Sequence, residues 1–152
     1  MTTAAYVVER QGDFELSTDS SRLDRALIHR FLSEQSYWAT GVPRAVVDRS
    51  LEYSLCFGVY RADEQVAFAR VITDRATFAY LADVFVLPEC RADGLGQWMI
   101  GIVMRHPELQ GLRRFLLATK DAHGLYARFG FAPLANPTRF LERFDPDVYA
   151  RS

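Results

Sequence analysis

The chain has 152 residues, a mass of 17.3 kDa and a net charge of −1 from 18 basic and 19 acidic side chains. This length suits one domain over residues 1–152, and 49% hydrophobic and 13% aromatic residues exclude a disordered chain. The near-neutral charge argues against nucleic-acid or anionic-lipid partners, and no apolar run is long enough to span a membrane. Cys56 and Cys90 are too few for a disulfide framework or a zinc site, so we expect no metal and a reducing, cytoplasmic compartment.

The first third of the chain predicts a hairpin and two helices. Residues 6–16 have strand character that is interrupted by a turn at Gly12. A helix is expected from Ser21, where Ser-Arg-Leu-Asp resembles a capping box and apolar residues follow at helical spacing. Pro43 suits the first turn of a second helix. The inward-facing residues of that helix should be Val46, Val47, Ser50 and Leu51.

From Ser54 the hydrophobic period changes to two, which is typical of strands. Strands are expected over residues 54–60, 66–73 and 77–87, and the short turns between them predict an antiparallel meander. Leu55, Phe57 and Val59 should face one side of the sheet.

The pattern then alternates between helix and strand. A helix over 94–106 leads to an apolar strand over 114–119, and this crossover predicts that strands 77–87 and 114–119 are parallel. A short helix over 121–129 and a last strand over 138–144 complete the chain. The expected fold class is α+β, with a mixed, mostly antiparallel sheet and helices on both faces.

Residues 84–96 carry the most informative pattern, because a buried strand runs into a turn that opens a helix. Unpaired N–H groups at the helix start would attract an anion, Gly94 and Gly96 would let it approach, and Arg91 would add a cation. No lysine follows as in a P-loop, and the antiparallel setting excludes the dinucleotide-binding fingerprint. The structural alternative is that both glycines only ease a tight turn.

Two motifs resemble those of the GCN5-related N-acetyltransferase (GNAT) family. Residues 91–96, Arg-Ala-Asp-Gly-Leu-Gly, resemble its Gln/Arg-x-x-Gly-x-Gly/Ala signature, and residues 125–131, Leu-Tyr-Ala-Arg-Phe-Gly-Phe, resemble its later Leu-Tyr-x-x-x-Gly-Phe element. The motifs occur in the family's order and at about its separation, and the resemblance covers residues 54–143. It implies the acyl-CoA N-acyltransferase fold and acetyl-CoA as the cofactor.

The resemblance also implies where acetyl-CoA lies. Its pyrophosphate would bind the backbone amides of residues 92–97, and its pantetheine arm would pair with the end of a bulged strand that splays from its neighbour. Thr119 stands where many members have an asparagine, and Asp93 adds an unusual negative charge. The expected cofactor-binding residues are Val84, Phe85, Val86, Arg91, Ala92, Asp93, Gly94, Leu95, Gly96, Gln97 and Thr119.

Two residues are candidates for catalysis. By resemblance, Tyr126 would donate a hydrogen bond or a proton to the leaving thiol; the alternative is a core aromatic. Asp83 interrupts an apolar run, where a carboxylate needs a partner. It would act as a base or orient the amine, although an ion pair with Arg70 or another sheet residue is the slightly favoured alternative.

Four residues are candidates for the acceptor pocket: Tyr37, Trp38, Tyr80 and His123. The aromatic rings could hold an ammonium by cation–π contact, or they could simply cap the core. His123, one turn from the tyrosine candidate, is a second candidate base; the alternative is a surface histidine.

The leading hypothesis is an acetyl-CoA-dependent N-acetyltransferase that transfers acetyl directly to a primary amine of a small molecule or peptide in a ternary complex. A non-catalytic acyl-CoA-binding or sensor module on the same fold is the second hypothesis. An unrelated scaffold with a structural glycine turn is the third. The sequence does not specify the acceptor, and it leaves a homodimer open.

Overall fold

The structure is a computed structural model that describes residues 5–151, with the side chains of Asp93 and Arg151 left out. Its centre is a six-stranded sheet in the order β1-β2-β3-β4-β5-β6, in which neighbours are antiparallel except for the parallel pair β5 and β6. The expected hairpin, meander and crossover are therefore confirmed. The strands are β1 (Val8–Gln11), β2 (Phe14–Ser17), β3 (Leu55–Arg61), β4 (Glu64–Thr73), β5 (Phe78–Val86) and β6 (Arg114–Leu117).

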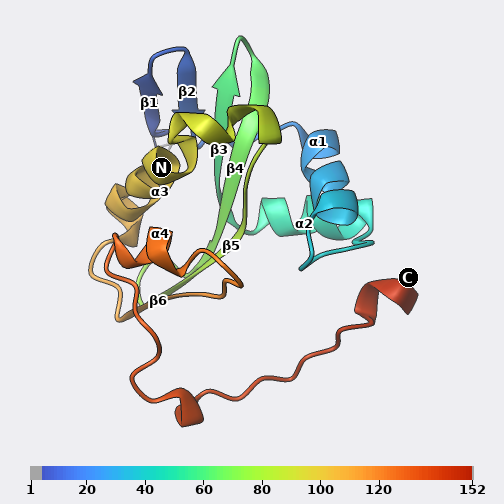
Figure 1. Ribbon diagram of the computed structural model, residues 1–152, viewed down its shortest axis with the longest axis vertical. Helices are drawn as coiled ribbons and strands as arrows, with labels where there is room; N and C mark the ends of the chain where they lie inside the picture. The colour runs from blue at the N-terminus through green and yellow to red at the C-terminus, as the bar shows by residue number, and fades with distance from the viewer. Residues whose placement is uncertain (1–4, 152) are drawn as a thin grey trace.

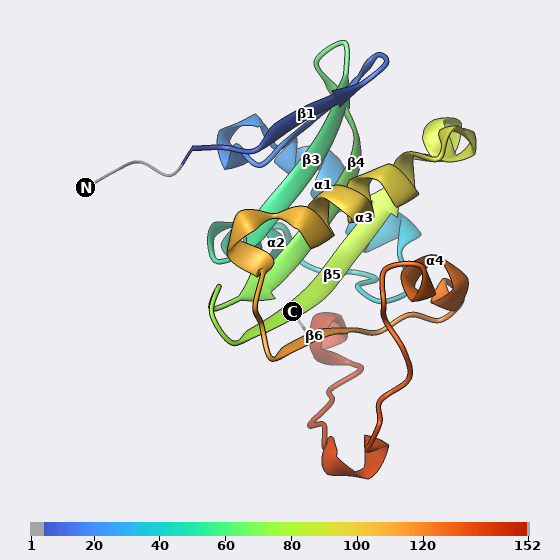
Figure 2. The same ribbon diagram turned by 90° about the vertical axis from the view of Figure 1, so that its left-hand side faces the viewer.

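Helices cover both faces of the sheet, which confirms the α+β class. Figure 1 shows α3 on one side of the strands and α1 and α2 on the other, and Figure 2 shows α3 running across the strands. No helix among residues 5–151 is both long and apolar enough to cross a membrane. The helices are α1 (Arg25–Arg30), continued by the π-helical turn η2 (Phe31–Gln35), α2 (Arg44–Glu52), α3 (Leu95–Arg105) and α4 (His123–Ala127); short 3-10 turns are η1 (Ser20–Arg22), η3 (Pro88–Asp93), η4 (Pro107–Leu109), η5 (Pro137–Arg139) and η6 (Val148–Arg151).

The period-two pattern of β3 builds two cores at once. Leu55, Phe57 and Val59 belong to the core under α3, whereas Cys56 belongs to the core under α1 and α2. Each of these side chains is buried, because a strand covered on both faces leaves neither row exposed to water. Cys56 and Cys90 are both free and buried.

The first helix begins later than predicted. Ser21 lies inside the 3-10 turn η1, whose cap is Asp19, and α1 starts after Asp24. The carboxylate of Asp24 accepts a hydrogen bond of 3.0 Å from the N–H of Leu27. Ser21 was predicted as the N-cap and Asp24 as the last residue of its capping box. That prediction was wrong, because Asp24 is itself the N-cap of α1 and its side chain accepts the capping hydrogen bond.

The inward face of α2 is narrower than predicted. Val47 and Leu51 are buried, whereas Val46 is 39% exposed and Ser50 is half-buried. Val46 and Ser50 instead line the cleft described below. The two residues that were predicted to face the core therefore face the cleft.

The predicted last strand over residues 138–144 is wrong. Residues 138 and 139 lie in η5, and no strand among residues 5–151 pairs with residues 140–144 that follow it. Leu141 is 96% exposed and Phe144 is 72% exposed. Alternating side chains favour an extended backbone, but they do not provide the neighbouring strand that a sheet requires.

Candidate active site

A bulge in β5 places a carboxylate at the centre of the molecule. Phe68 pairs with Phe85 and Arg70 pairs with Ala82, so Asp83 and Val84 together face a single residue of β4. Asp83 has a φ of 54°, in the left-handed region that aspartate tolerates better than most residues. The bulge turns the end of β5 away from its earlier course, as the resemblance predicted for this strand.

The edge of β5 next to β6 is unpaired beyond the bulge. The parallel pairing joins residues 78–81 of β5 to residues 114–117 of β6 and then stops. Residues 82–86 have no strand partner on that side within the described part of the chain. Val84 and Val86 are half-buried there, so a wedge opens between the two strands along an edge of β5 that no strand pairs.

The N-terminus of α3 lies beside the end of β5. Gly94, in the left-handed region at φ 67°, precedes the helix and has no side chain to accept from its first N–H groups. A Cβ atom placed on Gly96 would lie 3.7 Å from a methyl group of Val86, which is ordinary contact. The packing of the protein therefore does not require glycine at 96, and a Cβ atom placed on Gly94 would meet no other atom within 4 Å.

The polar side chains of this turn contact neighbouring groups. Arg91 Nε donates a hydrogen bond of 2.9 Å to the carbonyl oxygen of Val86, and Gln97 accepts one of 3.0 Å from Arg128. Arg91 and Ala92 are exposed, whereas Leu95 is buried in the core. The predicted side-chain contribution of Asp93 lies outside the described residues.

A cleft of about 690 Å³ extends along the wedge. Its walls are formed by η2, α2 and the loop between them, by β4, the bulged part of β5 and the end of β6, and by the loop after β6, α4 and the C-terminal turn. They are Leu32, Tyr37, Trp38, Ala39, Val42, Val46, Val47, Ser50, Arg70, Tyr80, Leu81, Ala82, Asp83, Val84, Leu117, Ala118, Thr119, Lys120, Asp121, Ala122, Tyr126 and Tyr149.

Asp83 is held from two sides at the floor of the cleft. Its Oδ2 accepts a hydrogen bond of 2.8 Å from Arg70 Nε, and its Oδ1 accepts one of 2.8 Å from the indole nitrogen of Trp38. Arg70 also donates to the hydroxyl of Ser54 at 3.1 Å. The side chains of the ion pair are only 15% and 10% exposed. The expected Arg70 partner is therefore present, and the carboxylate keeps lone pairs for another donor.

Tyr126 is the one residue of α4 that lines the cleft. It is 8% exposed, and its ring packs edge-on against Phe131 with centroids 6.0 Å apart. Burial raises the pKa of its phenol, and the nearby Tyr37 raises the pKa further. The hydroxyl is therefore protonated throughout the neutral range and can act as a donor.

Aromatic residues of the loop after η2 and of β5 also line the cleft. Tyr37 packs edge-on against Trp38 at 5.1 Å, and its hydroxyl accepts a hydrogen bond of 3.2 Å from the N–H of Lys120. Lys120 Nζ lies 5.4 Å from the centroid of the Tyr37 ring. With Tyr80 also in the wall, the structure brings the three predicted aromatic residues to one cleft.

Of the two remaining predicted residues, Thr119 lines the cleft and His123 does not. His123 is exposed at the start of α4 and is not among the residues that line the cleft. Thr119 does line it, but its hydroxyl oxygen accepts a hydrogen bond of 3.0 Å from the N–H of Ala122. Thr119 thereby orders the turn before α4 and retains its own hydroxyl hydrogen for a ligand.

The sequence analysis missed Lys120 and Tyr149. Lys120 is the single lysine of the chain and follows Thr119 directly, so its position was a usable signal. Tyr149 reaches the cleft from the C-terminal turn, and no pattern indicated that this end of the chain returns to the core.

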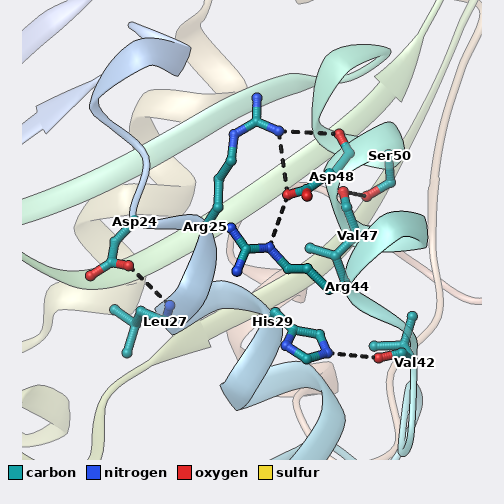
Figure 3. A network of polar contacts seen from close by, with 9 residues as sticks. All are labelled: Asp24, Arg25, Leu27, His29, Val42, Arg44, Val47, Asp48 and Ser50. Atoms are coloured by element: carbon teal, nitrogen blue, oxygen red, sulfur yellow. Dashed lines mark hydrogen bonds and ion pairs between the residues drawn. The ribbon is translucent and has the colours of Figure 1, made fainter.

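A polar network outside the cleft positions its α2 wall (Figure 3). Asp48 Oδ1 accepts hydrogen bonds of 3.4 Å from Arg25 of α1 and 3.2 Å from Arg44 of α2. Burial opposes ionisation, but the hydrogen bonds and the positive charges of Arg44 and Arg25 together outweigh it and lower the pKa of Asp48. His29 Nε2 lies 3.0 Å from the carbonyl oxygen of Val42, which joins α1 to the loop that forms the cleft.

Among the described residues, no group of three or more His, Cys, Asp or Glu side chains could hold a metal ion.

Comparisons with known proteins agree with this geometry. The family model described as "Acetyltransferase (GNAT) domain" matches residues 52–133. A protein of Gibberella zeae named as a putative acetyltransferase is 36% identical over 78% of each chain. A crystal structure of a GNAT-family protein from Xanthomonas campestris pv. campestris is 56% identical, with a TM-score of 0.88 over 90% of this chain and 96% of that one. Glucosamine-6-phosphate N-acetyltransferase from Arabidopsis thaliana shares the fold at 16% identity, with a TM-score of 0.63 over 87% of this chain and 99% of that one.

Proposed function

Because the chain belongs to the GNAT acetyltransferase family, we propose that it transfers acetyl from acetyl-CoA directly to a primary amine of a small molecule or peptide in a ternary complex. One observation carries this proposal. The unpaired edge of β5 starts beside the cleft that holds Tyr126 and Asp83, and its far end, at Val86, lies next to Gly96 at the start of α3.

The residues at this junction fit acetyl-CoA. The N–H groups at the start of α3, beyond Gly94, would bind the pyrophosphate, with Arg91 close enough to exchange its contact with Val86 for a phosphate oxygen. The backbone of residues 84–86 would pair with the pantetheine arm. When bound, acetyl-CoA supplies an acetyl thioester, which is activated for attack by an amine.

Tyr126 would donate a hydrogen bond or its proton to the leaving sulfur. Because the thiol of coenzyme A has a pKa of about 8.5, its thiolate leaves more readily than an alkoxide would. A single hydrogen-bond donor at the sulfur is therefore enough to assist its departure. The phenol suits this role because its raised pKa keeps its proton in place before the reaction. Its buried position also limits access of water to the reacting centre.

Asp83 would bind and orient the acceptor amine. An alkyl ammonium has a pKa of about 10.4, so the amine must lose a proton before it can attack. The free lone pairs of Asp83 can accept that proton or hold the amine through a hydrogen bond, while Arg70 and Trp38 keep the carboxylate in place. The rings of Tyr37 and Tyr80 would attract the approaching cation.

The experiment has two steps. Calorimetry with coenzyme A should detect binding, and a panel of amino acids, polyamines, amino sugars and peptides should then release thiol from acetyl-CoA with at least one member. Absence of any coenzyme A binding would overturn the proposal. Tight binding without acetylation of any amine would instead favour a non-catalytic acyl-CoA-binding module.

A further inference from the structure

Four charged side chains line the cleft within the described part of the chain, and two of them bind each other. Arg70 and Asp83 form the buried ion pair. Lys120 and Asp121, in the loop between β6 and α4, are exposed, and neither forms an ion pair with any described side chain. The positive charge of Lys120 is therefore available to a ligand in the cleft.

Two contacts with Tyr37 set the position of Lys120. The N–H of Lys120 donates a hydrogen bond of 3.2 Å to the Tyr37 hydroxyl, and its Nζ lies 5.4 Å from the centroid of the Tyr37 ring. The ring attracts the ammonium to its face and so draws it toward the aromatic residues of the cleft. Asp121 is the next residue, but no hydrogen bond or ion pair with a described residue holds its carboxylate. Lys120 is therefore the charge whose position the fold sets, and Asp121 only weakens its field.

Tyr37 also connects Lys120 to the proposed binding group for the amine. The Tyr37 ring packs edge-on against Trp38 at 5.1 Å, and the indole nitrogen of Trp38 donates to Asp83 at 2.8 Å. Each member of one series of cleft residues therefore contacts the next: Lys120, Tyr37, Trp38 and Asp83. A ligand that lies on these two rings with its amine at Asp83 would present its other end to Lys120.

We propose that the acceptor carries a carboxylate in addition to its amine, and that Lys120 binds this carboxylate. The inference rests on the proposed acetyl transfer, and it names the acceptor class for that site. The second ammonium of a diamine would meet the like charge of Lys120, whereas a carboxylate gains a charge-assisted hydrogen bond. Because two rings separate Lys120 from Asp83, the amine and the carboxylate should be several bonds apart. This favours ω-amino acids and short peptides over α-amino acids, whose two groups share one carbon atom.

Matched pairs of acceptors test the proposal. The acceptors β-alanine, 4-aminobutanoate, 6-aminohexanoate and glycylglycine are each compared with their primary amides, which replace the carboxylate by a neutral group of similar size. The kcat/KM of at least one acid should exceed that of its amide about 10-fold, as expected for a hydrogen bond between charged groups. No preference for the acid in any pair would overturn the proposal.

Variants assign the preference to Lys120. Lys120→Gln should bring the ratio of acid to amide close to one, and Lys120→Arg should retain the preference. Asp121→Asn should increase it, because the opposing charge is removed. Arg49→Gln is the matched control, since it makes the same change of charge at an exposed residue of α2 that does not line the cleft. A preference that persists in Lys120→Gln would overturn the proposal.

Binding of the products gives a readout without turnover. Calorimetry on the complex of the protein with coenzyme A should detect the N-acetylated acid of the preferred pair but bind its N-acetylated amide about 10-fold more weakly. Equal binding of the two products would overturn the carboxylate site. If acids and amides are acetylated equally well, acetyl transfer stands and only this inference fails. If the acetylated acid binds preferentially but no amine is acetylated, the carboxylate site stands and the proposed transfer fails.

Discussion

The indole nitrogen of Trp38 donates a hydrogen bond of 2.8 Å to Asp83, 45 residues further along the chain. This contact joins the loop after η2 to the bulge of β5, and the second carboxylate oxygen of Asp83 binds Arg70. One carboxylate therefore connects both walls of the cleft, which makes it both a structural support and the proposed binding group for the amine.

The substitution Asp83→Asn tests the role of this carboxylate in catalysis. Asparagine tolerates the positive φ of the bulge but cannot accept a proton, so kcat/KM for the amine should fall about 100-fold. The Kd of coenzyme A should not change, because the substitution leaves the cofactor-binding groups in place. A kcat/KM for the amine equal to that of the parent would assign Asp83 to a purely structural role.

The substitution Arg70→Met tests the contribution of the buried ion pair to stability. Because the pair is 10–15% exposed, removing one partner leaves a buried charge without compensation and should cost about 3 kcal/mol in the free energy of unfolding. Adding Asp83→Asn should recover part of the loss, since the uncompensated charge is then absent. A loss below about 1 kcal/mol in urea unfolding would indicate that the pair behaves like an exposed one.

The substitution Tyr126→Phe removes the proposed donor but keeps the buried ring. We expect kcat to fall about 100-fold, with the Kd of coenzyme A within about 2-fold of the parent value. Since burial raises the pKa of Tyr126, any basic limb below pH 10 should persist in the variant. Tyr53→Phe, at a residue that is 79% exposed and outside the cleft, is the control. Equal rates in both variants would exclude Tyr126 from the mechanism.

The substitution Gly96→Val tests the proposed pyrophosphate site. A Cβ atom has room at this position, so the melting temperature should change little, but the larger side chain would occupy the space before the α3 donors. The Kd of coenzyme A should rise at least 30-fold, and Gly96→Ala should give a smaller increase. Unchanged binding by the valine variant in calorimetry would place the phosphates elsewhere.

His106 should make the stability of the fold depend on pH. Burial lowers its pKa, and its Nδ1 accepts a hydrogen bond of 3.0 Å from the N–H of Glu108, so the fold contains the neutral ring. The unfolded chain, in which histidine has a pKa of about 6.5, then binds more protons than the fold does. The contribution of His106 to the free energy of unfolding is therefore fully present above about pH 6.5 and decreases as the pH falls toward 5.

The measurement is urea unfolding between pH 5 and 8. The decrease should be smaller in His106→Gln than in the parent, whereas His123→Gln, at an exposed histidine, should retain it. Parallel stability curves for the parent and His106→Gln would show that other groups cause the pH dependence.

The period-two runs and the crossover pattern predicted the sheet because they are repeated over many neighbouring residues. Each strand of the meander contains enough alternating side chains to define its faces, and the structure differs from the prediction at their ends by only a few residues. The helix caps were harder to predict, since a single hydrogen bond, from Leu27 N–H to Asp24, selects the start of α1. Similar side chains at Ser21 and Asp19 offered competing acceptors nearby.

The candidate site could also be predicted only in part, where its residues are close together in the sequence. The turn before α3 could be recognised because the glycines and Arg91 lie within a few residues of each other. The partners of Asp83 could not be assigned in full: Arg70 is on the adjacent strand, but Trp38 approaches across the face of the sheet. The spacing of one helical turn from Tyr126 predicts that His123 reaches the site, but its side chain is exposed and does not line the cleft.

Short stretches of the amino-acid sequence therefore determined which helices and strands form, in which order they follow one another, and where the glycine turn lies. The reason is that backbone preferences and hydrophobic periodicity act over short distances along the chain. Only tertiary packing decided that Trp38 meets Asp83, that Tyr149 returns to the cleft, and that residues 138–144 remain unpaired. Such contacts depend on how separate elements share one buried volume. That arrangement is set by the summed packing of the whole chain, and no short segment encodes it.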